Sequence, residues 1–288
     1  MSIADSYDAI PYQSTPFPET HPGHLACLAR LYGVEAAPPT RCKVLELGCA
    51  SGGNLIPMAA RMPESTFMGI ELSPEQAEEG AARVAKLGLR NCEIRSADIL
   101  DLQDEGFRYD YIITHGVYSW SPPEVRERIM QLSSQLLSAQ GVAYISFNAL
   151  PGWRMRGMLR DILMHQVRDI DSPAARLEAA QSYLAFLEAG IGELEAAHID
   201  YLKEEITRIR HSHPSYLYHE YLETFNEPML LQDFIAAAER HGLDYLCDID
   251  QALQFPGYLG EQAEQVMSMI EDPLERLQQT DFLLNRNF

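Results

Sequence analysis

The feature that most constrains the fold of this chain is a regular alternation of short apolar runs and helix-like segments between residues 43 and 150. The apolar runs have the length of buried strands, and helical spacing of apolar residues follows them. Alternation of this kind builds parallel sheets with helices on both faces. It predicts an α/β, doubly wound, Rossmann-like and mostly parallel sheet, with its first five strands at residues 43–47, 66–72, 92–99, 109–116 and 141–150.

The pattern changes after the fifth expected strand. Residues 153–211 read as one helix after another, and a helix at 229–243 precedes a short strand at 244–249. We interpret the helical block as a cap inserted after the fifth strand. The amphipathic tail either ends the chain naturally or begins a regulatory domain. The expected regions are an N-terminal aromatic lid and helix (1–42), the ligand-binding core (43–150), the helical cap (151–227), a return to the core (228–257) and a helical tail (258–288).

Glycines and carboxylates gather at the ends of the first three strands. The run "ELGCASGGN" places Gly48, Ala50 and Gly52 after the first strand, where a backbone can turn sharply and approach a ligand. Glu71 ends the second strand and can accept from two ribose hydroxyls. Asp98 follows the third strand and can accept from an exocyclic amine. Ligands of open α/β sheets bind at this edge, so the ordered set outlines a nucleoside.

Two kinds of nucleoside fit the glycine loop. The loop matches a loosened dinucleotide fingerprint, but Ala50 stands where a glycine would let the backbone reach a pyrophosphate. Glu46 points the same way as Gly48 by strand alternation, and a carboxylate suits an ammonium or sulfonium better than a pyrophosphate. These residues resemble the class I S-adenosylmethionine (AdoMet)-dependent methyltransferases, whose first motif reads E-x-G-x-G-x-G, with a departure at Ala50.

The resemblance implies AdoMet as the cofactor and a sheet of the seven-stranded type. It places Glu46 near the methionine part, Glu71 at the ribose, and Asp98 with Ile99 at the adenine. The cofactor-binding residues that we expect are Tyr7, Tyr12, Glu46, Gly48, Ala50, Ser51, Gly52, Asn54, Glu71, Leu72, Asp98, Ile99 and His115.

Segments outside the common core resemble one subgroup more closely. The runs "THGVYSW", "SFNALPGW" and "HEYLETFNEPMLLQDFIAAAERHGLDYL" are similar to bacterial methyltransferases with a methyltransferase regulatory domain. This subgroup includes rickettsial outer-membrane-protein lysine methyltransferases. The resemblance implies a lysine side chain on a protein as the acceptor. A small-molecule N- or O-methyltransferase and a cofactor-binding module without turnover are the alternatives.

Aromatic residues and one amide flank the expected fourth and fifth strands. Aromatic faces suit a cationic amine, and an Asn carbonyl could orient its lone pair. Methyl transfer to nitrogen needs a neutral amine and an in-line approach. The catalytic candidates are Tyr118, Trp120, Asn148 and Trp153, with His115 beside them.

The N-terminal stretch "YDAIPYQSTPFPETHP", Tyr7–Pro22, holds four prolines and several rings. Proline removes a backbone donor and restricts the residue before it, so we expect no helix in this stretch. We interpret Tyr7–His21 as a lid, with Tyr7 and Tyr12 facing the cofactor or acceptor. An arm that merely packs on the sheet is the alternative.

Charge and composition exclude several partners. The 42 acidic against 22 basic residues give a net charge of −20, which disfavours a nucleic-acid substrate. No apolar run is long enough to span a membrane. Five cysteines without a C-x-x-C pair indicate reduced thiols in the cytoplasm. His211, His213 and His219 lack the further ligands of a zinc site, so we expect no metal.

Overall fold

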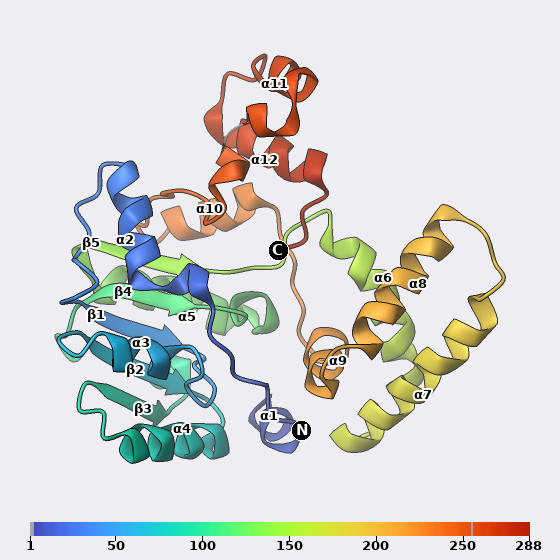
Figure 1. The fold of residues 1–288 in the computed structure, drawn as a ribbon, viewed down its shortest axis with the longest axis horizontal. Coiled ribbons are helices and arrows are strands. Elements are labelled where there is room, and N and C mark those ends of the chain that lie inside the picture. The colour runs from blue at the N-terminus through green and yellow to red at the C-terminus, as the bar shows by residue number, and fades with distance from the viewer. Residues whose placement is uncertain (1–2, 255) are drawn as a thin grey trace. The chain divides into compact units, whose positions relative to one another are not determined.

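The computed structural model describes residues 3–254 and 256–288, and the chain divides into two compact units whose elements are labelled in Figure 1. The helical unit contains the N-terminal residues through Gln13 and the segment Arg154–Thr224. The sheet unit contains Ser14–Trp153 and Phe225–Phe288. The N-terminal region is therefore shared between the two units, with its boundary after Gln13.

The sheet unit is built on a parallel sheet in the order β3-β2-β1-β4-β5. The chain order reverses between β1 and β4, so the loops after these two strands meet at the switch point where such folds bind ligands. The α/β Rossmann-like fold with a parallel sheet is confirmed. Its strands are β1 (Lys43–Leu47), β2 (Thr66–Glu71), β3 (Cys92–Ser96), β4 (Tyr109–Thr114) and β5 (Leu137–Ile145).

Helices cover both faces of this sheet, because neighbouring residues of a strand point to opposite sides. Val44 of β1 packs in one core with residues of α2, α3 and α4, whereas Leu45 packs in a second core with residues of α5. Both side chains are almost completely buried. The helices of the sheet unit are α2 (Pro22–Leu31), α3 (Leu55–Arg61), α4 (Pro74–Leu87), α5 (Pro123–Leu136), α10 (Leu231–Glu239), α11 (Glu261–Met267) and α12 (Pro273–Leu284).

The outer edge of β5 carries no further strand in the described part of the chain. A groove of about 630 Å³ follows this edge and is lined by β5, α2, α10 and residues 242–249. The strand predicted at 244–249 is not formed. Leu246 and Ile249 pack against the core instead, and the Asp248 carboxylate accepts the Asp250 N–H at 2.9 Å, which turns the chain. The described sheet thus has five of the seven strands that we expected.

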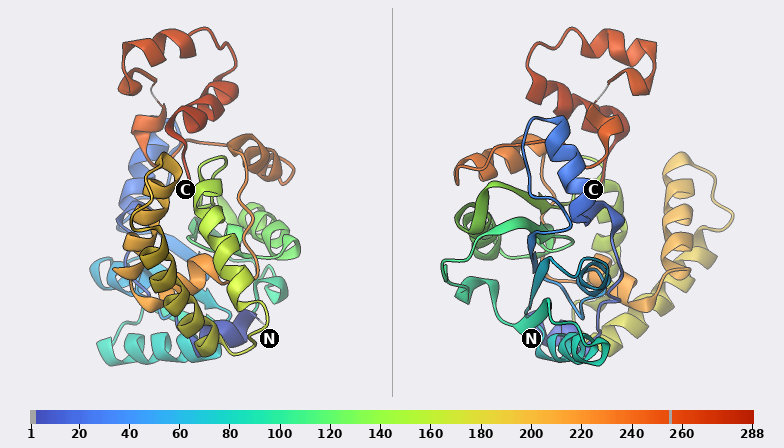
Figure 2. Two further views of the ribbon diagram at one scale, coloured as in Figure 1. Left: turned by 90° about the vertical axis from the view of Figure 1, so that its right-hand side faces the viewer. Right: turned by 60° about the vertical axis from the view of Figure 1, so that its left-hand side comes forward.

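The helical unit has a hydrophobic core of its own, which includes Leu159, Leu184 and Ile206. Figure 2 shows two of its helices, α7 and α8, side by side in yellow and gold. No described helix, in either unit, is both long and apolar enough to cross a membrane. The helices of this unit are α1 (Ile3–Ala9), α6 (Trp153–Val167), α7 (Pro173–Ile191), α8 (Ala197–Arg210) and α9 (Pro214–Tyr221).

Helix α1 corrects the expectation that Tyr7–Pro22 contains no helix. The helix runs through Tyr7 to Ala9 and ends just before Ile10-Pro11. Proline restricts its own position and the residue before it, but it leaves the preceding turn free to be helical. The region that does lack an α-helix is shorter, from Ile10 to His21, and contains one 3₁₀ turn at Pro18–Thr20.

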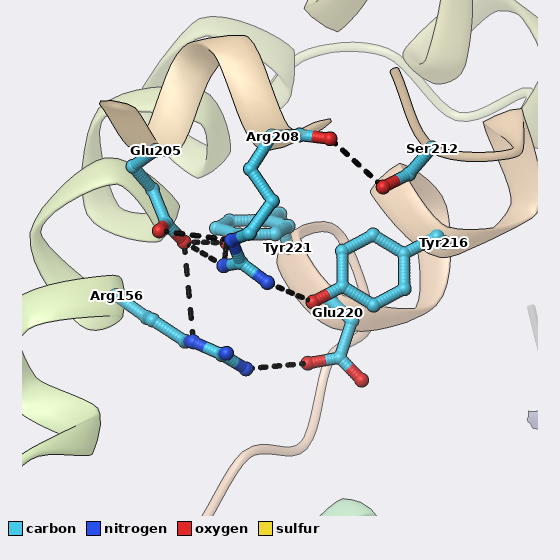
Figure 3. A network of polar contacts seen from close by, with 7 residues as sticks. All are labelled: Arg156, Glu205, Arg208, Ser212, Tyr216, Glu220 and Tyr221. Carbon is cyan, nitrogen blue, oxygen red and sulfur yellow. Dashed lines mark hydrogen bonds and ion pairs between the residues drawn. The ribbon is translucent and has the colours of Figure 1, made fainter. Parts of the chain in front are cut away.

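A polar network joins α6, α8 and α9 inside the helical unit (Figure 3). Arg208 contacts the Glu205 carboxylate and donates to the Tyr216 hydroxyl at 2.6 Å and the Tyr221 hydroxyl at 3.0 Å. The Tyr221 hydroxyl also donates to Glu205. The Glu205 side chain is only 7% exposed, so its charge depends on these partners.

A second carboxylate of the network is held more loosely. Glu220 lies 3.9 Å from the Arg156 guanidinium, which in turn lies 4.0 Å from Glu205. Burial raises the pKa of Glu220 to about 7, and the positive charges of Arg156 and Arg208 oppose this rise. The network therefore links three helices through charged side chains that are largely buried.

Candidate functional site

The loop after β1 contains three residues in the left-handed backbone region. Gly48, Ala50 and Gly52 have φ angles of 74°, 48° and 77°. A Cβ on Gly48 would lie 2.4 Å from a methyl carbon of Val117, which belongs to the loop after β4. The loops after β1 and β4 are thus in direct contact, and only glycine allows this approach at position 48.

Glu46 lies just before this loop and is 3% exposed. Its Oε1 accepts from the Asn54 amide at 2.8 Å, but its Oε2 is buried without a hydrogen-bond partner in the described part of the chain. Burial raises the pKa of Glu46 to about 8, the Asn54 hydrogen bond lowers it, and the nearby Glu71 charge adds to the rise. A buried carboxylate oxygen without a partner can accept a hydrogen bond from a ligand or bind a positively charged group of a ligand.

Residues 14–20, which we call the strap, bind to the same loop. The Ser14 hydroxyl accepts the Gly53 N–H at 2.7 Å, and the Phe17 N–H donates to Asn54 Oδ1 at 2.9 Å. The Asn54 amide also donates to the Thr20 hydroxyl at 3.0 Å. Asn54 therefore connects the strap to Glu46 through one side chain.

The end of β2 forms the next part of the site. The Glu71 carboxylate accepts the Ala50 N–H at 2.8 Å and the Ser73 N–H at 2.9 Å, so it ties the glycine loop to the start of α4. Gln76, in the first turn of α4, is 3% exposed, and neither atom of its amide has a partner in the described part of the chain. Sequence reasoning missed Gln76. Its place five residues after Glu71 was the available signal.

The remaining expected cofactor residues of the sheet unit lie around these groups or support them. Ser51 accepts from the Arg83 guanidinium at 3.0 Å and is buried. Asp98, after β3, accepts the Leu100 N–H at 2.9 Å and begins a 3₁₀ turn that includes Ile99. Leu72 lies half-buried after Glu71.

His115 follows β4 and lies among aromatic rings. Its Nδ1 is 3.1 Å from the Tyr144 hydroxyl, and the Phe17 ring of the strap lies 3.8 Å from its own ring, centroid to centroid. Burial lowers the pKa of His115 to about 4, so the ring is neutral at physiological pH. The His115 ring, which follows β4, therefore contacts both β5, through Tyr144, and the strap, through Phe17.

The four catalytic candidates lie in the sheet unit, after β4 and β5. Asn148 is 1% exposed, and its amide nitrogen is buried without a partner in the described part of the chain. Trp120 and Trp153 are in edge-to-face contact with centroids 5.6 Å apart. Tyr118 packs on Phe234 in the hydrophobic core. Asn148 is therefore the candidate whose surroundings call most clearly for a ligand.

Tyr7 and Tyr12 belong to the helical unit and contact His219 of α9. The Tyr7 ring stacks on the imidazole with centroids 4.6 Å apart, and the Tyr12 ring meets its edge at 5.6 Å. His219 also contacts the Ile10 carbonyl at 2.7 Å and the Glu223 carboxylate at 2.8 Å. The expectation that Tyr7 and Tyr12 bind the cofactor stays a prediction.

Two sequence families match the chain. A methyltransferase domain matches residues 44–141, and a predicted methyltransferase regulatory domain matches residues 213–288. An uncharacterized protein of Rickettsia prowazekii is 36% identical over 289 residues, which covers 100% of this chain and 52% of that protein. A second R. prowazekii protein is 32% identical over 235 residues, or 82% of this chain and 94% of that protein.

One solved structure resembles almost the whole chain. PKMT2 from Rickettsia typhi, in complex with AdoHcy, has a TM-score of 0.86 at 32% identity. The similarity covers 96% of this chain and 53% of PKMT2. The chain thus spans about half the length of PKMT2 and of the first R. prowazekii relative.

Proposed function

Since this chain belongs to the class I methyltransferases that carry a methyltransferase regulatory domain, we propose that it transfers a methyl group from AdoMet to a lysine side chain of a protein. PKMT2 is solved with AdoHcy, and the similarity to it covers almost the whole of this chain. The sequence resemblance to rickettsial lysine methyltransferases supports the acceptor class.

The observation that carries the proposal is the unpartnered Oε2 of the buried Glu46. A methionine ammonium would give this oxygen a charged donor, and the sulfonium nearby would favour the ionised carboxylate. Glu71 has two oxygens that already accept one N–H each and can take ribose hydroxyls as well. Gln76 and Asp98 would serve the nucleoside end. These residues fit AdoMet, which when bound supplies an activated methyl group on sulfur.

Asn148 is the residue that we assign to the acceptor. Its side-chain amide is buried and its nitrogen lacks a partner, which favours a polar group of a substrate close by. The amide nitrogen would donate to a polar group of the substrate, and the carbonyl oxygen of the same side chain would accept from the acceptor amine. Trp120 and Trp153 would supply aromatic faces for the cationic amine or its methylated product.

Two finer features of the fold are also proposals. We expect the free edge of β5 to take the further strands of a seven-stranded sheet, because no further strand pairs with this edge in the described part of the chain. Slow amide exchange at Val142 and Tyr144 would support pairing there, and fast exchange would contradict it. We expect the helical unit to act as a cap, so that its removal alters the choice of acceptor.

The proposal also includes a cellular compartment and a class of partner for this chain. Cys27, Cys42, Cys49, Cys92 and Cys247 are all free thiols in the structure. This agrees with a reducing, cytoplasmic location. The acceptor is a protein, and the strongly acidic chain favours basic segments around the lysine over nucleic acid.

The first experiment measures cofactor binding by calorimetry. We expect the wild type to bind AdoMet and Glu46→Gln to bind it about tenfold more weakly, because a charged hydrogen bond is lost. Glu93→Gln is the matched control, since Glu93 is exposed on β3 and pairs with Arg95 at 2.6 Å. Equal affinity of the wild type and Glu46→Gln would overturn the assignment of Glu46.

The second experiment locates the methyl group. Methyl-labelled AdoMet is added with a demethylated extract of the source organism, and label is counted in precipitated protein and in the soluble fraction. Label in protein that survives nuclease digestion supports the lysine acceptor. Label in the soluble fraction alone makes the chain a small-molecule methyltransferase, and binding without transfer makes it a cofactor-binding module. Asn148→Ala should keep AdoMet affinity and lose about a hundredfold or more in transfer rate.

A further inference from the structure

Tyr144 is a residue that neither the motifs nor the family resemblance singles out, yet its hydroxyl contacts the His115 ring. Tyr144 lies near the end of β5, which pairs with β4 just before His115. Its hydroxyl is 3.1 Å from His115 Nδ1, and the two rings are nearly parallel, with 17° between their planes. Neighbouring strands therefore hold the phenol against one particular nitrogen of the imidazole.

The surroundings of His115 keep its ring neutral and fixed. Phe17 of the strap packs on the imidazole with centroids 3.8 Å apart, and the edge of Phe288 meets it at 5.7 Å. Burial holds the pKa of His115 at about 4, although the Glu19 charge opposes this shift. A neutral imidazole carries a single N–H, so the choice of tautomer decides which nitrogen donates.

The direction of the Tyr144 contact follows from the strength of the two possible hydrogen bonds. Burial raises the pKa of the Tyr144 hydroxyl, so the phenol keeps its proton. A phenol is a good donor and a neutral imidazole nitrogen a good acceptor, whereas the reverse pairing joins a weaker donor to a weaker acceptor. The Tyr144 O–H thus donates to Nδ1, and the ring proton is left on Nε2.

We propose that Tyr144 is a positioning residue that holds His115 in the Nε2–H tautomer, and that this N–H donates to the carboxylate of the methionine part of AdoMet. The inference rests on the proposed function for the identity of the ligand. The methionine part carries two opposite charges, and Glu46 can take the ammonium alone. A chain of contacts joins His115 to Glu46, because the Phe17 ring packs on His115 and the Phe17 N–H donates to Asn54, whose amide donates to Glu46.

The tautomer can be tested without any ligand. Nitrogen-15 NMR of histidine distinguishes a protonated ring nitrogen from one that accepts a hydrogen bond. We expect wild-type His115 to have Nε2 protonated and Nδ1 as the acceptor across pH 6–8. Tyr144→Phe should shift the ring toward a mixture of tautomers. Tyr109→Phe is the control, because Tyr109 is a half-buried tyrosine at the start of β4, whereas His115 follows the end of this strand. A wild-type ring protonated on Nδ1 would overturn the inference.

The ligand group can be tested with decarboxylated AdoMet, which lacks only the carboxylate. We expect Tyr144→Phe to bind AdoMet about three- to tenfold more weakly than the wild type, with unchanged affinity for the decarboxylated probe. Tyr109→Phe should change neither affinity. Equal losses for both probes would mean that Tyr144 only supports the fold, and this would overturn the inference while leaving the cofactor proposal intact. If the wild type binds neither probe, the proposed function and the carboxylate assignment both fail.

Discussion

Ala50 occupies a backbone conformation that suits glycine better. Its φ of 48° lies in the left-handed region, where a Cβ crowds the backbone and the conformation costs about 1–2 kcal/mol. The family motif has glycine at this position, and the structure keeps the left-handed turn despite the substitution. The strain is therefore stored beside the proposed cofactor site.

This strain predicts that Ala50→Gly raises the free energy of unfolding by roughly 0.5–1 kcal/mol, after the flexibility of glycine in the unfolded chain is taken into account. Chemical denaturation measures the effect. Ala85→Gly is the matched control, because Ala85 is an exposed residue in the right-handed helix α4. This substitution should lower the free energy of unfolding by about 1 kcal/mol. Equal losses in both variants would show that Ala50 is not strained.

Glu46 predicts a pH dependence of stability. Its pKa rises from 4.5 to about 8 on folding, so between these values the folded chain holds a proton that the unfolded chain releases. The free energy of unfolding should fall with rising pH, by about 1 kcal/mol per unit from this group between pH 5.5 and 7.5. Denaturation of Glu46→Gln at several pH values should show a flatter profile than the wild type. Glu93→Gln should retain the wild-type slope, and a similar profile for all three would exclude the buried proton.

Some site residues were visible in the sequence because their chemistry depends on position along a strand. Glu46, Glu71 and Asp98 stand at strand ends, and strand ends can be found from apolar runs alone. Gln76 and Tyr144 stand within a helix and a strand, where polar and aromatic residues are ordinary. Their importance depends on a missing partner or on one neighbour across the sheet, and neither can be seen before the chain is folded.

At the scale of elements, α1 depends on α9 for its attachment within the helical unit. Both ring nitrogens of His219 face acceptors, the Ile10 carbonyl and the Glu223 carboxylate, and Ser6 donates to the same carboxylate at 2.9 Å. Tyr7 and Tyr12 pack on the same imidazole ring, so α1 and the residues after it contact α9 through one side chain.

We expect His219→Ala to release α1 from α9. Hydrogen exchange of the α1 amides should become about tenfold faster or more, while α7 amides stay protected as an internal reference. His211→Ala is the control, because His211 is exposed and its ring contacts the Thr207 carbonyl of α8, the helix that it follows. Unchanged exchange in α1 would show that contacts other than those of His219, such as the hydrogen bond from Ser6 to Glu223, are enough to hold it.

The polar network of Figure 3 predicts different effects for two arginines of α8. Arg208→Met leaves the buried Glu205 with its weaker partners, so we expect a loss of about 2–3 kcal/mol in the free energy of unfolding of the helical unit. Arg210 pairs with Glu188 at the surface, and Arg210→Met should cost less than about 1 kcal/mol. Thermal denaturation followed by circular dichroism compares the two. A similar loss in both would mean that the network adds nothing beyond a surface ion pair.

Elements with strong periodicity were predictable, and elements that depend on partners were not. The five strands and α4 follow from apolar spacing and a Ser-Pro start, and the structure contains all of them. The run 244–249 has the composition of a strand, but Asp248 turns the chain through its own side chain and no ladder forms. Helix α1 was not predicted from the sequence, because the contacts that hold it come from His219, more than 200 residues away.

At the scale of the whole molecule, charge acts against compactness. The 42 acidic and 22 basic residues repel one another on balance, and salt screens this repulsion. Raising sodium chloride from about 0.02 to 0.3 M should raise the melting temperature by roughly 2–5 °C, because the screening length falls from about 20 to about 6 Å. Choline chloride should act equally if screening is the cause. A lower melting temperature in salt would show that attractive pairs dominate.

The division of the chain into two units was only partly foreseeable. The change from alternating to purely helical patterning after the fifth strand is plain in the sequence. The inclusion of the first 13 residues in the helical unit is not, because it rests on long-range contacts such as that between Ser6 and Glu223. The local sequence pattern therefore predicts where the helical region begins, but it does not predict which distant residues pack in the same unit.

The pairing of the first residues with α9 has a consequence for biosynthesis. The N-terminal segment leaves the ribosome first, but the Glu223 carboxylate that Ser6 contacts is made 217 residues later. At about 5–20 residues per second, α1 waits roughly 10–40 s for its partner. During that time Tyr7 and Tyr12 have no His219 to pack on, and they are open to chaperones and proteases. We therefore expect the docking of α1 on α9 to be the last step in folding the helical unit.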